Sequence, residues 1–159
     1  YGGGQEKGLR SGTENIAAIV GFGKACELAT QGLNDFAAHS ESLRDYLETS
    51  LADTGAVIFG QQAERLPNTS FFAFKNIDGE TLVTALDKLG FAVASGSACS
   101  SASSEPSHVL LAMDVERDLA RGAIRVSFNM DSTLMQVDEF LTVLKQALHD
   151  LRQMTAVAA

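Results

Sequence analysis

The chain shows two hydrophobic patterns, one with helical spacing and one with strand spacing. Apolar residues three and four positions apart predict helices, which cover residues 16–28, 33–51, 78–89, 107–113, 115–120 and 133–149. Alternating or continuous short apolar runs predict strands, which cover residues 56–59, 68–74, 90–93 and 123–128. Helices and short strands in this order predict an α/β fold: a small mixed or antiparallel sheet covered by helices.

One predicted strand carries an arginine in its middle. Residues 123–128 place Ile124 and Val126 on one face, and Arg125 and Ser127 on the other. An arginine buried without a partner is costly. Either this face is wet, which is the commoner case, or Arg125 holds an anion.

Glycine punctuates residues 1–13, which we expect to form a loop. Ser11 and Glu14 have the spacing of a capping box in front of the first helix. Free backbone N–H groups at a helix start favour anions, and here Thr13 adds a hydroxyl and Arg10 a cation. An ordinary capped helix remains the simpler interpretation of this motif.

The two cysteines differ in their surroundings. Cys99 lies in the serine-, glycine- and alanine-rich run 94–106, which has neither helical nor strand periodicity. Such a position suits a reactive thiol, although a small residue in a linker is the more frequent case. Cys26 lies within an apolar helical run and is predicted to be a core residue.

Composition narrows the class of protein. The 159 residues are 45% hydrophobic with two prolines, which fits one globular domain. A net charge of −8 argues against broad nucleic-acid binding. The two cysteines are far apart in sequence, which fits reduced thiols in the cytoplasm. No apolar run reaches the length of a membrane span. No residues have the spacing of metal ligands. The start at Tyr1, without methionine, suggests a piece of a longer polypeptide at least as readily as a processed protein.

Four stretches together resemble the cysteine desulfurases, a class V branch of the pyridoxal-phosphate aminotransferase-like enzymes. They are residues 2–15, 95–101, 105–110 and 124–127, which read GGGQEKGLRSGTEN, SGSACSS, EPSHVL and IRVS. Their order and spacing match over nearly the whole chain, and the serine-rich cysteine loop is similar to that of the subgroup serving iron–sulfur cluster assembly. The match implies the C-terminal portion of such an enzyme and the C-terminal domain of fold-type I transferases.

The resemblance assigns roles to four residues. Cys99 matches the catalytic cysteine, which takes sulfur from L-cysteine as a persulfide and leaves L-alanine. Arg125 matches the arginine that binds the substrate carboxylate. Thr13 matches the residue that reaches the cofactor phosphate of the partner subunit in a homodimer, and Arg10 supports that contact. The implied partners are L-cysteine, a second subunit and a sulfur-acceptor or scaffold protein, with no nucleic acid and no membrane.

The resemblance also implies a domain organisation. Residues 1–13 are the cofactor-phosphate loop, residues 14–159 are a small domain with the cysteine loop, and the large domain with the Schiff-base lysine lies outside this chain. We therefore expect this chain alone to be inactive. At positions 129 and 130 the family usually has glycine and a basic residue, whereas this chain has Asn129 and Met130. His108 matches a position of the family's pattern, but packing or helix capping is enough to explain a histidine there.

Two alternatives remain. One is a non-catalytic orphan domain for dimerisation or for docking of sulfur acceptors. The other is a selenocysteine lyase or a related class V lyase.

Overall fold

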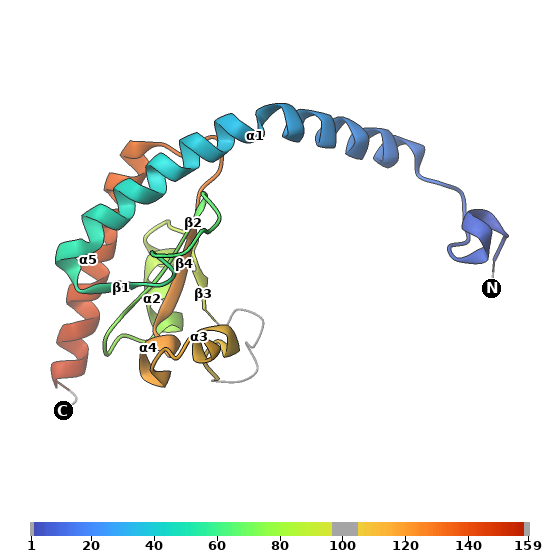
Figure 1. Ribbon diagram of the computed structural model, residues 1–159. Coiled ribbons are helices and arrows are strands. Elements are labelled where there is room, and N and C mark those ends of the chain that lie inside the picture. Colours follow the sequence, from blue (N-terminus) through green and yellow to red (C-terminus); the bar gives the residue numbers. More distant parts are fainter. Residues whose placement is uncertain (1, 97–104, 158–159) are drawn as a thin grey trace. The chain divides into compact units, whose positions relative to one another are not determined.

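The computed structural model describes residues 2–96 and 105–157 of the chain (Figure 1). Two compact units share these residues, Tyr1–Asp35 and Phe36–Ala159. The predicted domain organisation is a different division of the chain and stays a prediction.

The first unit contains a short 3-10 helix, η1 (Gln5–Gly8), and the beginning of α1 (Ile16–Leu51). The predicted capping box is wrong, because α1 begins after Asn15 and not after Ser11. The Asn15 Oδ1 atom accepts a hydrogen bond of 3.1 Å from the backbone N–H of Ala18, which satisfies one of the free donors at the helix start.

The predicted break between the first two helices is also wrong, because α1 continues through residues 29–32. Gly32 lies within this continuous stretch of helix. A glycine inside a helix costs only about 1 kcal/mol relative to alanine and leaves the backbone hydrogen bonds in place, unlike proline.

Cys26 is exposed in the described structure, which corrects its prediction as a core residue. The large apolar side chains of the same part of α1 are also more than half exposed: Ile16, Ile19, Val20, Phe22, Leu28 and Leu33. The apolar residues at helical spacing therefore predicted the helix correctly, but they did not predict whether its side chains are buried.

The second unit is built on four strands, β1 (Ala56–Ile58), β2 (Thr69–Phe74), β3 (Ala94–Ser95) and β4 (Ala123–Ser127). They form one sheet in the order β1-β2-β4-β3, and every neighbouring pair is antiparallel. The structure confirms the predicted small, helix-covered sheet with antiparallel pairing. The strand predicted over 90–93 is displaced, since only the two residues of β3 pair with β4.

Helices cover both faces of this sheet. Three helices pack on the first face: residues 36–51 of α1, α2 (Gly79–Lys88) and α5 (Leu134–Val157) (Figure 1). The short 3-10 helix η2 (Ala52–Thr54) follows α1 in the chain. The side chains buried there include Leu43, Leu47, Phe72, Phe74, Leu82, Leu86, Ile124, Phe140 and Leu144. The shorter α3 (His108–Ala112) and α4 (Arg117–Arg121) pack on the second face. That smaller core contains Phe59, Ala73, Leu110, Ala120 and Ala123.

Candidate active site

Arg125 lies in the middle of the sheet, on the face opposite the larger core. In the strand register it stands between Phe71 of β2 and Ala94 of β3. The side chains of Ile124 and Val126 are buried, whereas Arg125 is exposed, as the alternating pattern predicts. Among the described residues no carboxylate forms an ion pair with Arg125. Its guanidinium therefore has free donors in the fork geometry that suits a carboxylate.

The chain that leads to Cys99 begins beside this arginine. After β3, the backbone N–H of Gly96 donates a 2.7 Å hydrogen bond to the carbonyl oxygen of Ala123. A Cβ atom at position 96 would lie 2.8 Å from the Cβ of Ala123 and 3.2 Å from the Cζ of Phe71. Only glycine fits this close approach without displacing the backbone. Cys99 itself lies outside the described residues.

The chain is described again from Glu105 onward. The carboxylate of Glu105 forms an ion pair with the guanidinium of Arg117, the first residue of α4. Pro106 is buried, and Leu110 of α3 belongs to the smaller core. Both described ends of the cysteine-bearing stretch thus contact the segment formed by α4 and β4.

Thr13 and Arg10 lie together in the first unit. The Nη1 atom of Arg10 donates to the carbonyl oxygens of Gly12 at 2.9 Å and Thr13 at 3.0 Å. Both side chains are exposed. Among the described residues no hydrogen bond occupies the Thr13 hydroxyl, and the other Arg10 donors are likewise unused. A hydroxyl beside a guanidinium is a donor set that suits a phosphate.

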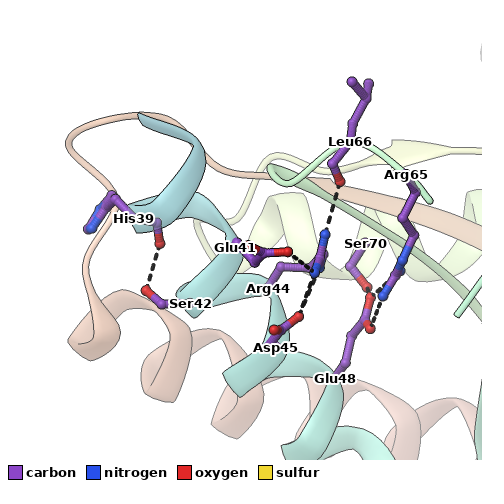
Figure 2. A network of polar contacts seen from close by, with 9 residues as sticks. All are labelled: His39, Glu41, Ser42, Arg44, Asp45, Glu48, Arg65, Leu66 and Ser70. Atoms are coloured by element: carbon purple, nitrogen blue, oxygen red, sulfur yellow. Dashed lines mark hydrogen bonds and ion pairs between the residues drawn. The ribbon is translucent and has the colours of Figure 1, made fainter. Parts of the chain in front are cut away.

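A buried polar network that the sequence did not predict holds β2 against α1 (Figure 2). The guanidinium of Arg65 donates to both carboxylate oxygens of Glu48, at 2.8 and 2.6 Å. The hydroxyl of Ser70, at the start of β2, donates to Glu48 at 2.8 Å. The Glu48 side chain is only 6% exposed, and its carboxylate is stabilised by the charge of Arg65, the hydroxyl of Ser70 and the nearby charge of Arg44. Because Ser70 precedes Phe71, the network supports the strand that faces Arg125 and Gly96.

Arg44 extends the network towards solvent. It donates to Asp45 at 2.7 Å, to Glu41 at 3.1 Å and to the carbonyl oxygen of Leu66 at 3.2 Å (Figure 2). The chain between β1 and β2 is therefore tied to α1 at Arg65 and at Leu66. Charged residues one turn apart on a helix usually indicate a solvated face, so the sequence pattern concealed this network.

Glu48 makes the stability of the second unit dependent on pH. Burial alone would raise the pKa of its carboxyl, but the hydrogen bonds from Arg65 and Ser70 outweigh burial and hold the pKa below its ordinary value of 4.5. The stabilisation is therefore fully present above pH 4.5 and is lost as the pH falls through the lower, folded value.

We expect Glu48→Gln to lower the free energy of unfolding of the second unit by about 1.5–3 kcal/mol at pH 7, because it leaves Arg65 without its charged partner. Glu41→Gln is the matched control: Glu41 is 56% exposed, and its loss should cost less than about 1 kcal/mol. Urea unfolding at pH 7 and at pH 3 measures both values. The penalty of Glu48→Gln should shrink at pH 3, and a penalty independent of pH would contradict the role given to Glu48.

Two histidines, His39 and His108, have structural positions in the second unit. Ring atom Nε2 of His39 lies 2.8 Å from the carbonyl oxygen of Ser132, which is a structural contact. His108 begins α3. Within residues 2–96 and 105–157, no group of three or more His, Cys, Asp and Glu side chains is arranged to hold a metal ion. Over the same residues, no helix is long and apolar enough to span a membrane.

Comparison with known proteins identifies the family. The family described as Aminotransferase class-V matches residues 3–140, and the chain belongs to it.

Curated proteins similar to this chain include cysteine desulfurases, as the four sequence stretches predict. One from Gluconacetobacter diazotrophicus is 44% identical over 156 residues, which are 97% of this chain and 39% of that protein. The cysteine desulfurase NifS of Azotobacter vinelandii is 40% identical over 97% of this chain and 39% of its own length. The chain therefore spans about two fifths of the length of the curated relatives it matches.

Solved structures agree with this assignment. A NifS-like protein aligns with a TM-score of 0.82 and 41% identity, over 95% of this chain and 38% of that one. The NifS-like protein of Rickettsia africae has a TM-score of 0.80 and 32% identity, over 93% of this chain and 39% of that one.

Proposed function

We propose that this chain is the C-terminal part of a pyridoxal-phosphate-dependent cysteine desulfurase and carries its sulfur-accepting cysteine and its carboxylate-binding arginine. The observation that carries the proposal is the strand register around Arg125. The free guanidinium stands directly beside β3, and β3 leads within four residues to Cys99. The identity of 40–44% to curated cysteine desulfurases supports the same reaction.

In the proposed reaction Arg125 binds the carboxylate of L-cysteine and orients the substrate. The thiolate of Cys99 attacks the substrate sulfur, so that a sulfur–sulfur bond forms as the carbon–sulfur bond breaks. The substrate Cβ receives a proton, L-alanine leaves, and Cys99 keeps the sulfur as a persulfide. Atoms balance without an external oxidant, because the persulfide sulfur gains the bond that the substrate carbon loses. The persulfide then passes to an acceptor protein that serves iron–sulfur cluster assembly or another sulfur-transfer pathway.

The residues of the first unit fit a role towards the cofactor. The hydroxyl of Thr13 and the guanidinium of Arg10 would hold the phosphate of pyridoxal phosphate bound to the other subunit of a homodimer. When bound, the cofactor supplies the electron sink that this chemistry needs. The lysines of this chain lack the sequence context of a Schiff-base lysine, so we propose that the chain alone does not turn over cysteine. We also propose that its parent is a cytoplasmic enzyme, because its two cysteines are far apart in sequence and fit reduced thiols.

The test is an assay with a protein of the relatives' full length that contains this chain. With L-cysteine and pyridoxal phosphate, we expect equal amounts of L-alanine and transferable sulfur, and no turnover from residues 1–159 alone. No alanine from the longer protein would instead favour the orphan-domain alternative, in which the unit serves dimerisation or acceptor docking.

A substrate comparison separates the other alternative. A desulfurase should turn over L-cysteine, because the thiolate of Cys99 is supplied for sulfur abstraction. Turnover of L-selenocysteine without turnover of L-cysteine would assign the protein to the selenocysteine lyases.

A further inference from the structure

The aromatic side chain of Phe71 lies on the same face of the sheet as Arg125 and directly opposite it. The two residues are partners in the register of β2 and β4. Opposite side chains of an antiparallel pair have Cβ atoms about 4.5–5.5 Å apart, so both side chains start from neighbouring points on that face. Phe71 is half-buried, whereas Arg125 is exposed. The arginine therefore has a large apolar neighbour on one side.

The ring of Phe71 crosses β4. A Cβ atom at position 96 would lie 3.2 Å from the Cζ atom of Phe71. Gly96 follows β3, and β4 lies between β2 and β3 in the sheet. A side chain that begins on β2 and ends at Gly96 must therefore pass over β4, on the face from which Arg125 projects. Ala123 lies on this face two positions before Arg125, and its small side chain leaves room for the ring.

Phe71 is itself held at three points. Its ring contacts the ring of Phe59 edge to face, with the centroids 5.3 Å apart. Its carbonyl oxygen accepts a hydrogen bond of 2.8 Å from the backbone N–H of Phe59. The preceding residue, Ser70, donates to the buried carboxylate of Glu48. The ring is therefore a fixed apolar surface and not a freely rotating side chain.

The other neighbours of Arg125 on this face are small. On the side of β3 its register partner is Ala94, and along β4 the same-face neighbours are Ala123 and Ser127. Among the described residues, neither an ion pair nor a hydrogen bond orients the guanidinium of Arg125. Of these four neighbours, only Phe71 has a side chain large enough to restrict the arginine.

We infer that Phe71 is a positioning residue for Arg125, which directs the guanidinium towards a carboxylate before the substrate binds. The inference rests on the proposed function, in which that carboxylate belongs to L-cysteine. Arginine lays its methylene stem along apolar surface and keeps its charged end in water. A fixed ring beside the stem excludes the rotamers that would occupy the same space, so less side-chain freedom is lost when the carboxylate binds.

The experiment measures carboxylate capture in the protein of full length with pyridoxal phosphate bound. The dissociation constant of L-alanine, measured by calorimetry, reports binding without sulfur transfer, and kcat and KM are measured with L-cysteine. Phe71→Ala should raise both KM and the dissociation constant about three- to tenfold, because Arg125 must then be ordered at binding. The value of kcat should change by less than about twofold, since the ordered arginine still binds the carboxylate.

A double-mutant cycle with Arg125→Ala separates positioning from a structural role. In the Arg125→Ala background, Phe71→Ala should change KM by less than about twofold, because the side chain that it positions is gone. Loss of a merely structural contact would weaken binding equally in both backgrounds. Phe71→Leu, with a shorter side chain, should cause a smaller loss with the same dependence on Arg125. This variant keeps the inference testable if Phe71→Ala does not fold.

Phe91→Ala is the matched control for the loss of a ring. Phe91 is half-buried like Phe71, and it packs against the larger core in an edge-to-face contact with Phe140, with centroids 5.5 Å apart. That core lies on the opposite face of the sheet from Arg125. Phe91→Ala should lower the thermal midpoint, as Phe71→Ala does, and leave KM and the dissociation constant of L-alanine unchanged.

The outcomes separate this inference from the function on which it rests. An unchanged KM and dissociation constant in Phe71→Ala, or an equal loss in the presence and absence of Arg125, would overturn the positioning role. Absence of L-alanine formation from L-cysteine by the unsubstituted protein would overturn the proposed function itself.

Discussion

Cys99→Ala should abolish sulfur release from L-cysteine while pyridoxal phosphate remains bound. The expected loss is at least on the order of 1,000-fold, because removal of a covalent nucleophile leaves only the contributions of binding and orientation. Alanine formation coupled to persulfide would be lost with it. Sulfide production is measured with L-cysteine, and cofactor occupancy by absorbance, both in the protein of full length.

Cys26→Ala is the matched control, since Cys26 is exposed and has no assigned role. It should leave both sulfide production and cofactor occupancy unchanged. Normal sulfide production by Cys99→Ala would reject the assignment of this cysteine. Equal losses from both variants would point to a general sensitivity to the loss of thiols.

Arg125→Ala should weaken the capture of L-cysteine. Hydrogen bonds to a charged group contribute about 1.5–3 kcal/mol, which corresponds to about a 10- to 150-fold loss in kcat/KM. The loss should appear mainly in KM, because the carboxylate is bound before and during sulfur transfer. Steady-state kinetics with L-cysteine provide the measurement.

Arg125→Lys is the informative companion variant. Lysine keeps the charge but cannot offer the planar pair of donors, so it should recover only part of the lost affinity. Because residue 125 is exposed in β4, neither variant should lower the thermal midpoint substantially. An unchanged KM in Arg125→Ala would show that Arg125 does not bind the carboxylate.

Local patterns predicted most elements of the second unit well. The alternation at residues 123–128 predicted the strand and the exposed face of Arg125, because successive side chains of a strand point to opposite faces. Asp78, predicted to start a helix, caps α2 by accepting from the N–H of Thr81 at 2.9 Å. Such features depend on neighbours in sequence, and the structure confirms them.

The errors have different causes. The predicted break near residue 32 gave too much weight to a local interruption of the apolar pattern, which a helix tolerates. The predicted burial of Cys26 required knowledge of what packs against α1. Helical periodicity shows that one face of a helix is apolar, but it does not show which residues pack against that face. The strand predicted over 90–93 failed similarly: only residues 94 and 95 find partners on β4, and pairing is a long-range property.

The sequence by itself determined the fold class, the family resemblance and the identity of the candidate residues, because these depend on residue type, order and spacing. Only the tertiary structure decided which of them meet. It placed Arg125 beside Ala94, closed Gly96 against Ala123 and Phe71, and joined Glu105 to Arg117. It also decided that Glu48 is buried with Arg65 and Ser70. These contacts join residues far apart in the chain, and only the antiparallel register and the packing on both faces of the sheet bring them together.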